Sequence, residues 1–251
     1  MKKKTKLNLS IFLLVIILCS ISYLGLKSQN TILESNYEKY KNLITENNSN
    51  KIAPDIENSS FYQKVQSGEN VNILLFGDEI TLGITSNEDV YQTDKEINTL
   101  LKSAYNTDSS FQFLEEKNAT ISSAYDSFDK NPAVTNYDLA IISFGLNDFK
   151  SNMPIDQFSQ YYSDLIGKIK NRNYKCSIVA VLPPSLTSEN SYVAAVKSVC
   201  KLNAVDYLDI PEIFSNSSYE VSELIDGDFP TLSGYNFIVS QFDTLIQRKL
   251  Q

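Results

Sequence analysis

The sequence predicts an α/β fold, a three-layer α/β/α sandwich built on a parallel sheet of about five strands and preceded by an N-terminal transmembrane helix. Short apolar runs of strand length alternate along the chain with longer segments whose apolar residues recur at helical spacing. The short runs are apolar almost throughout, which is typical of strands buried on both faces of a parallel sheet. Alternation of strands and helices favours helices on both sides of that sheet.

The elements of this domain follow one another from residue 61 to the C-terminus. Predicted strands cover residues 71–76, 111–114, 139–144, 177–182 and 205–208. Predicted helices cover residues 90–105, 153–169, 192–202 and 235–250. Gly77, Gly145 and Pro183 end three of the strands. Because ligands bind beyond the carboxyl ends of parallel strands, residues 77–79 and 145–148 are expected along one functional edge.

The N-terminal 27 residues predict a membrane anchor. Residues 7–26 carry no charge and follow four lysines within the first six residues. About 20 apolar residues span roughly 30 Å of hydrocarbon, and the lysines keep the N-terminus cytoplasmic. A signal peptide removed by cleavage, or a lipoprotein signal that uses Cys19, remains an alternative. In each case the domain lies outside the cell membrane.

Three segments therefore organise the chain. Residues 1–27 form the anchor, residues 28–60 a polar and turn-prone spacer, and residues 61–251 the α/β domain. The first 27 residues hold five lysines and no acidic residue, so the remaining 224 hold 17 basic and 30 acidic side chains, a net charge of −13. Such an acidic domain repels phosphate backbones, and we expect no nucleic-acid partner.

Histidine is absent from all 251 residues. This excludes Ser-His-Asp and Cys-His hydrolases, histidine-ligated zinc sites and imidazole pH switches. Any chemistry must use carboxylates, amides, hydroxyls, lysine, tyrosine or a bound cation.

Four segments resemble, in order, the signature blocks of the SGNH (GDSL) hydrolases. They are Phe76-Gly77-Asp78-Glu79-Ile80-Thr81-Leu82-Gly83, Asn118-Ala119-Thr120-Ile121-Ser122-Ser123, Gly145-Leu146-Asn147-Asp148, and Asp226-Gly227-Asp228-Phe229-Pro230 followed by Gly234-Tyr235. A single block would be weak evidence, whereas the ordered set on strand ends is specific. The resemblance implies the family's flavodoxin-like sandwich.

The resemblance also implies where the family's catalytic groups would lie. Glu79 stands at the position of the nucleophilic serine, Phe229 at that of the basic histidine, and Ser123 at that of the block-two glycine. Asn147, an oxyanion donor in the family, and Asp226, which orients the histidine, are retained. Loss of nucleophile and base together removes the acyl-enzyme route.

The expected pocket residues are Gly77, Asp78, Glu79, Ser123, Gly145 and Asn147. Gly77, Asp78 and Asp226 can equally be turn or capping residues, and Phe229 can simply plug the pocket. Five acidic side chains near the predicted edge would suit Ca²⁺ if they converged: Glu79, Asp78, Asp148, Asp226 and Asp228. Their spacing in the sequence is not that of a recognised Ca²⁺-binding loop. We expect no metal and no cofactor.

These observations predict a membrane-tethered, catalytically inactive SGNH-like protein that binds a cell-wall glycan or an acylated ligand. One alternative is an enzyme with altered chemistry centred on Glu79 and Asp226, for example an acid and base pair. Another is a structural module for an unspecified protein partner, with the pocket collapsed around Phe229. Outside the anchor, Cys176 begins one strand and Cys200 ends the following helix, which predicts a disulfide, the alternative being two buried thiols.

Overall fold

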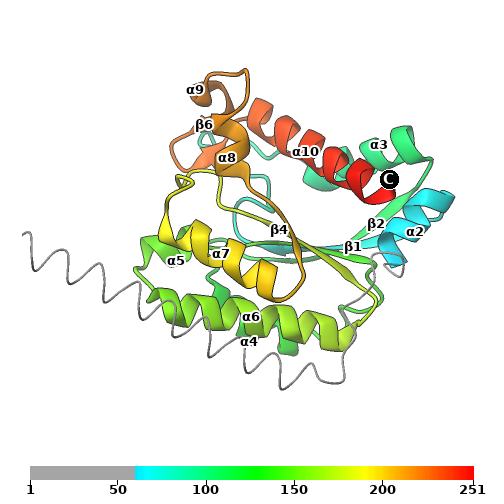
Figure 1. Cartoon of the computed structure of the whole chain (residues 1–251), viewed down its shortest axis with the longest axis horizontal. Helices are drawn as coiled ribbons and strands as arrows, with labels where there is room; N and C mark the ends of the chain where they lie inside the picture. Colours follow the sequence, from blue (N-terminus) through cyan, green and yellow to red (C-terminus); the bar gives the residue numbers. More distant parts are fainter. Residues whose placement is uncertain (1–59) are drawn as a thin grey trace, which may run out of the picture. The chain divides into compact units, whose positions relative to one another are not determined.

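A computed structural model describes residues 60–251, which contain a five-stranded parallel sheet of order β2-β1-β3-β4-β5 (Figure 1). The strands are β1 (Val71–Gly77), β2 (Ser109–Glu115), β3 (Leu139–Ser143), β4 (Ser177–Val181) and β5 (Asp206–Leu208). All four strand pairs are parallel. The predicted α/β fold with a parallel sheet of five strands is therefore confirmed.

Side chains of the sheet alternate between two apolar clusters. Along β1, Leu74 and Phe76 enter one cluster, whereas Ile73 and Leu75 enter the other. Successive residues of a strand point to opposite faces, so a strand covered on both sides must be apolar at nearly every position. This explains the continuous apolar run seen in the sequence.

Helices cover both faces of the sheet (Figure 1). The lower layer contains α4 (Ile121–Lys130), α6 (Ile155–Arg172) and α7 (Ser191–Leu202), with α5 (Leu146–Lys150) at its edge. The upper layer contains α2 (Ser60–Ser67), α3 (Thr93–Tyr105) and α10 (Leu232–Leu250), with α8 (Ile210–Ser215) and α9 (Val221–Leu224). A small antiparallel hairpin, β6 (Ile225–Asp226) and β7 (Phe229–Pro230), precedes α10.

Helices α4 and α10 each begin at a side chain that caps the helix. Thr120 caps α4 in a capping box with Ser123, and Thr231 caps α10 by accepting a hydrogen bond from Gly234 N. These bonds satisfy backbone N–H groups that have no partner within the helix. The cap of α4 also fixes the preceding segment, which lies at the functional edge.

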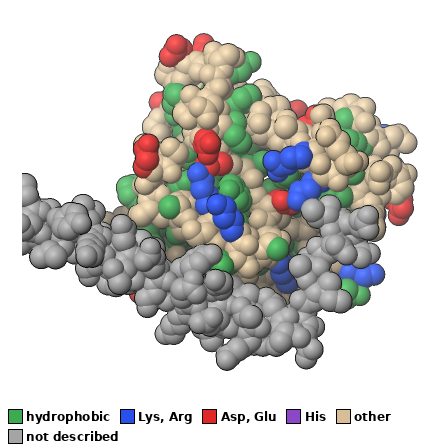
Figure 2. Space-filling view, viewed as in Figure 1, with side chains coloured by type: hydrophobic (Ala, Val, Ile, Leu, Met, Phe, Trp, Pro, Cys, Tyr) green, Lys and Arg blue, Asp and Glu red, His purple; other side chains and the backbone are tan. Residues whose placement is uncertain are grey.

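Charged side chains of opposite sign are interspersed on the face drawn in Figure 2. Among the ion pairs of the described residues, Lys197 pairs with Asp209 and Lys249 pairs with Asp206. On the part of this face that the described residues form, the basic side chains lie in separate groups.

The predicted disulfide is not formed, which corrects the expectation for Cys176 and Cys200. Both are buried free thiols within the lower apolar cluster. Cys176 Sγ instead lies 2.9 Å from the carbonyl oxygen of Ser177, its neighbour in the chain. Burial among apolar side chains is a common role for an unpaired cysteine.

The predicted anchor, residues 1–27, lies outside the described residues, and so does the predicted spacer, residues 28–60, apart from its last residue. Among residues 60–251, no helix combines the length and apolar character that a membrane crossing needs. The domain predicted from residue 61 opens with α2, which begins at Ser60.

Candidate functional site

The first feature of the site is the sharp turn after β1. A Cβ on Gly77 would lie 2.6 Å from Thr81 Oγ1 and 2.7 Å from the carbonyl oxygen of Ser143, so only glycine allows this close approach. The next residue, Asp78, accepts a hydrogen bond from Ile80 N at 3.0 Å through Oδ1. Asp78 is almost fully buried and holds the turn that projects Glu79.

The Glu79 carboxylate is held by two donors from different parts of the chain. Asn118 N donates to Oε1 at 2.9 Å, and Asn147 Nδ2 donates to Oε2 at 2.9 Å. Asn147 Nδ2 also donates to the carbonyl oxygen of Ala119 at 3.1 Å. Glu79 is 4% exposed, so its charge relies on these bonds rather than on water.

Asn118 is the site residue for which sequence reasoning had assigned no role. Its φ of +60° is left-handed, a conformation that asparagine tolerates better than most residues. This conformation turns the Asn118 N–H towards Glu79. Ser123, expected at the glycine position of the second block, instead lies within the first turn of α4, where its Oγ accepts from Thr120 N at 3.0 Å.

Gly145 and Asn147 come from the carboxyl end of β3. Gly145 has a φ of +129° and immediately precedes α5, and a Cβ there would lie 3.0 Å from Pro183 Cγ. Glycine is therefore needed both for the backbone conformation and for the close approach. The resulting turn places Asn147 in the first turn of α5, from which its amide reaches Glu79.

A second buried carboxylate, Asp148, lies beside this network. Its Oδ1 accepts from Ile121 N at 3.0 Å, whereas Oδ2 has no hydrogen-bond partner among the described residues. Burial raises the pKa of Asp148 to about 6. The pKa of Asp78 is raised to about 8. Burial is the main cause, the bond from Ile80 N lowers the pKa, and the nearby charges of Glu79 and Asp148 raise it.

The hairpin that carries Phe229 and Asp226 lies at the surface. Phe229 is half-buried and packs against the small cluster of Ile80, Tyr91 and Tyr235. Asp226 is exposed and accepts a 2.5 Å hydrogen bond from Ser86 Oγ. The structure thus ties Asp226 to the loop after β1, and Glu79 accepts its hydrogen bonds from Asn118 and Asn147.

One basic side chain links the hairpin to the site. Lys150 Nζ lies 2.8 Å from Asp228 Oδ2 and 5.6 Å from the centroid of the Phe229 ring. Lys150 belongs to α5, the helix that carries Asn147. Within residues 60–251, no three acidic or cysteine side chains are grouped as a metal site would require.

The arrangement has a specific chemical meaning. Two preorganised N–H donors bond to one carboxylate, the Asn118 N–H to Oε1 and the Asn147 amide to Oε2, and preorganised donors of this kind stabilise negative charge on oxygen. Here the chain supplies its own anion, the carboxylate of Glu79. The structure brings together four of the residues considered above: Asp78, Glu79, Asn147 and Asp148. Ser123 instead bonds to Thr120, and Asp226 bonds to Ser86.

Solved structures similar to this chain include several esterases. A lipase/acylhydrolase from Enterococcus faecalis is 16% identical with a TM-score of 0.62, over 72% of this chain and 97% of that one. A two-domain esterase active on acetylated mannans is 16% identical with a TM-score of 0.61, over 78% of this chain and 57% of that one. A Clostridium thermocellum family 3 carbohydrate esterase is 16% identical with a TM-score of 0.59, over 72% and 100%. At these identities the likeness concerns the fold.

A search of curated proteins returned no significant match. The model of the GDSL-like lipase/acylhydrolase family matches residues 75–236, from the end of β1 to the start of α10. That range contains Glu79, Asn118, Asn147 and Phe229 and covers more than half of the chain. This protein is therefore a member of the GDSL-like lipase/acylhydrolase family.

Proposed function

We propose that this chain is a catalytically inactive member of its family that binds a glycan outside the cell membrane. The observation that carries the proposal is the Glu79 carboxylate, which occupies both the Asn118 N–H and the Asn147 amide. The chain has no histidine that could act as base, and Phe229 stands where the resemblance places one.

Hydrolysis of an ester by this family's route needs a hydroxyl nucleophile, a neighbouring base and free donors for the oxyanion. Glu79 replaces the hydroxyl and at the same time saturates the donors. A hydrogen bond to a charged group contributes about 1.5–3 kcal/mol, more than a neutral bond. A neutral ester carbonyl therefore cannot displace the carboxylate without a net loss, and the acyl pocket is closed by the chain itself.

The rim of the site favours a sugar as the bound group. Phe149 is 43% exposed on α5, next to Lys150, which reaches Asp228 and the Phe229 ring. An exposed aromatic ring beside charged hydrogen-bonding groups matches the apolar faces and hydroxyls of a sugar. The esterase active on acetylated mannans and the family 3 carbohydrate esterase have the same fold, which agrees with a glycan ligand.

The proposed location rests on residues 7–26, an uncharged segment preceded by lysines. As an anchor it would hold the domain at the outer face of the membrane, and as a cleaved signal it would release the domain. Either arrangement gives access to cell-wall glycans.

The first experiment measures turnover of aryl acetates and acetylated xylan by the wild type and by Glu79→Gln. We expect neither protein to exceed the buffer rate, since no nucleophile and base are present. Turnover by the wild type that Glu79→Gln abolishes would overturn the inactive assignment and revive chemistry at Glu79.

The second experiment measures binding of acetylated and unacetylated xylan and mannan oligosaccharides by calorimetry. We expect Phe149→Ala to weaken binding about tenfold, because the lost apolar contact between the ring and the sugar is worth about 1.4 kcal/mol. Phe113→Ala is the matched control, because Phe113 is similarly exposed at 49% but lies on edge strand β2. Equal affinity of both variants would contradict the proposed glycan surface.

A further inference from the structure

We propose that the edge of the domain opposite the Glu79 site binds the surface of an anionic phospholipid bilayer. This edge, here named the amino-terminal edge, is formed where the five parallel strands begin. The inference goes beyond the proposed function, because it concerns a different surface and does not depend on a glycan ligand. It draws on the proposed anchor only for the way in which the domain is brought to the membrane.

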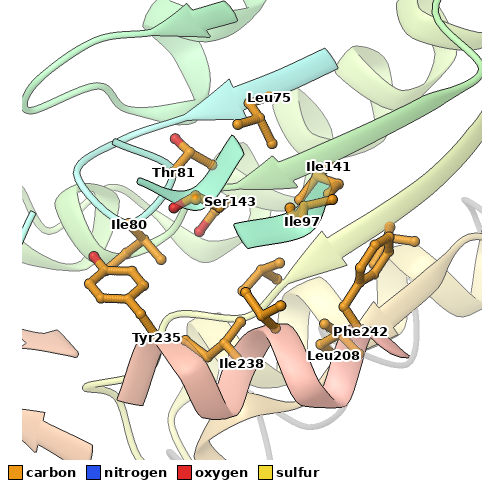
Figure 3. Close-up of a pocket in the computed structure, with 14 residues that line it drawn as sticks. Leu75, Ile80, Thr81, Ile97, Ile141, Ser143, Leu208, Tyr235, Ile238 and Phe242 are labelled. Carbon is orange, nitrogen blue, oxygen red and sulfur yellow. The ribbon is translucent and has the colours of Figure 1, made fainter. Parts of the chain in front are cut away.

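The fold brings the carboxyl ends of several helices to the amino-terminal edge. Only three or four residues separate the ends of α3, α6 and α7 from the strands that follow them. In Figure 3, Tyr235, Ile238 and Phe242 of α10 point towards the sheet, so α10 runs along it. Helix α10 also ends at the amino-terminal edge, because Lys249 Nζ lies 2.7 Å from Asp206 Oδ1 at the start of β5.

Basic side chains are concentrated at these helix ends. Helices α3, α4, α6, α7 and α10 each have at least one lysine or arginine in the last turn, an arrangement that complements the helix dipole. Arg172, at the end of α6, donates to the carbonyl oxygen of Phe128 at 3.0 Å, so α4 ends beside it. Four exposed basic side chains in this region have no ion-pair partner among residues 60–251: Lys130, Lys175, Lys201 and Arg248.

Acidic side chains at the amino-terminal edge are largely neutralised. Asp108, Asp138 and Asp206 each pair with a lysine at 2.7–2.9 Å, whereas Glu69 has no basic partner among the described residues. The opposite edge carries the carboxylates around Glu79 and the acidic residues of the hairpin. The negative charge of the domain is therefore unevenly distributed. An anionic surface attracts the amino-terminal edge and repels the opposite one.

An exposed aromatic ring lies among these basic groups. Tyr174, in the turn before β4, is 78% exposed, more than any other large apolar side chain in the described part of the chain. Lys175 Nζ lies 5.8 Å from the centroid of its ring. Tyrosine is enriched where membranes meet water, because its ring contacts apolar groups while its hydroxyl contacts polar ones. The ring therefore favours a bilayer over a soluble polyanion, which has no apolar layer.

The preceding chain joins the domain at the amino-terminal edge. Helix α2, the first described helix, lies across the starts of two strands, because Tyr62 OH donates to Asp206 Oδ2 at 3.5 Å and Lys64 Nζ lies 2.9 Å from Asp138 Oδ1. Residues 28–59 connect this helix to the predicted anchor. Tethering raises the effective concentration of the edge at the bilayer, so a few basic side chains suffice to orient the domain. The glycan site then faces away from the membrane.

Fluorescence quenching in lipid nanodiscs tests this orientation with the full chain. In a Cys19→Ala background, an NBD label is attached at Asn171→Cys, at the end of α6, or at Ser188→Cys, in the loop after β4, while the buried Cys176 and Cys200 stay unlabelled. The discs contain a lipid with a spin-labelled headgroup, in either phosphatidylglycerol or phosphatidylcholine.

The two labels should differ only in anionic discs. We expect quenching at position 171 to be at least about threefold stronger than at position 188, because anionic headgroups attract nearby lysines and arginines. In neutral discs the two labels should be quenched equally. They should also be quenched equally in anionic discs at 1 M salt, where the screening length falls to about 3 Å.

Charge-reversal variants separate the amino-terminal edge from the overall charge. Lys175→Glu combined with Lys201→Glu should abolish the difference between the labels. Lys95→Glu combined with Lys117→Glu is the matched control, because these exposed lysines lie at the opposite edge and the net charge changes equally. This control should leave the difference unchanged, and Tyr174→Ser should reduce it.

Three results would overturn the proposal. They are equal quenching of both labels in anionic discs, a difference that persists in neutral discs, and loss of quenching when soluble polyglycerol phosphate is added at the same phosphate concentration. The last result would assign the edge to a polyanion in solution. A chain that shows the expected difference in anionic discs but does not enter neutral discs would support the lipid contact and contradict the anchor.

Discussion

Replacing Asp78 by asparagine should make the domain more stable at neutral pH. The Asp78 carboxyl is buried beside Glu79 and Asp148, and its pKa is raised to about 8. A raised folded-state pKa means that the folded protein holds a proton that the unfolded chain releases. The corresponding stability is complete below about pH 4 and is lost as the pH rises towards about 8.

The structure sets the size of the effect. The ordinary pKa of an aspartate, 3.8, lies about three pH units below pH 7. Each unit corresponds to about 1.4 kcal/mol, so the wild type loses about 4 kcal/mol of its free energy of unfolding by pH 7. Asparagine has no proton to retain, and its amide oxygen can still accept from Ile80 N. Asp78→Asn should therefore match the wild type near pH 4 and exceed its free energy of unfolding by about 4 kcal/mol at pH 7.

Urea unfolding followed by circular dichroism at pH 4, 5.5 and 7 measures this difference. Asp148 titrates in both proteins, with a pKa of about 6, and its contribution cancels in the comparison. Asp126→Asn, an exposed position on α4, is the control and should change stability by less than about 0.5 kcal/mol at every pH. A gain for Asp78→Asn that is the same at pH 4 and pH 7, or a loss at pH 7, would refute the reasoning.

Three further outcomes follow from the described contacts. Asn147→Ala removes a donor from the buried Glu79 carboxylate, and urea unfolding at pH 7 should show a loss of about 2–3 kcal/mol, whereas an unchanged midpoint would contradict the network. Gly234→Ala would place a Cβ 1.9 Å from the carbonyl oxygen of Leu224, so the Tm of thermal unfolding should fall by several degrees. An unchanged Tm would show that the backbone relieves this close approach at little cost in stability. The buried thiols of the domain should resist DTNB at pH 8 in the native protein and react after denaturation without reductant; a missing thiol signal would indicate a disulfide after all.

The sheet could be predicted closely because a strand that is buried on both faces is a continuous apolar run in the sequence. Residues 71–76 and 177–182 are apolar at nearly every position, and the structure has β1 and β4 there. The edge strand β2 was predicted only at 111–114, since Ser109 and Ser110 are polar at a position where one side of the strand has no neighbour. Local composition therefore indicates interior strands better than edge strands.

The short helices could not be predicted in this way, because they show no repeating pattern of apolar residues. Helices α5 and α9 have five and four residues, too few for a helical period to repeat. Helix α4 has ten residues and was missed because its apolar face is sparse, with Ile121, Ala124 and Phe128 as its buried residues. Its existence depends on packing against the sheet and α6 rather than on its own sequence.

The site was predictable where it depends on motif order and unpredictable where it depends on a tertiary contact. The positions of Glu79 and Asn147 on strand ends could be inferred, but their hydrogen bond joins residues 68 apart. The part played by Asn118 depends on a left-handed backbone that sequence alone suggests only weakly, through the identity of the residue. The expected disulfide failed for a related reason, because strand and helix boundaries do not define how two thiols face each other.

Helix α10 has a consequence for how the chain acquires its fold. It packs against α2, the first described helix, through Phe61 and Phe242, whose ring centroids are 6.3 Å apart (Figure 1). Every sheet pairing also joins strands distant in sequence, since parallel strands need a crossover between them. A chain that lacks residues 232–251 thus exposes the part of the upper cluster that α10 covers, and the fold can be completed only once α10 is available. Refolding on a timescale of about milliseconds to seconds, with truncated chains aggregating, is the behaviour that such a topology imposes.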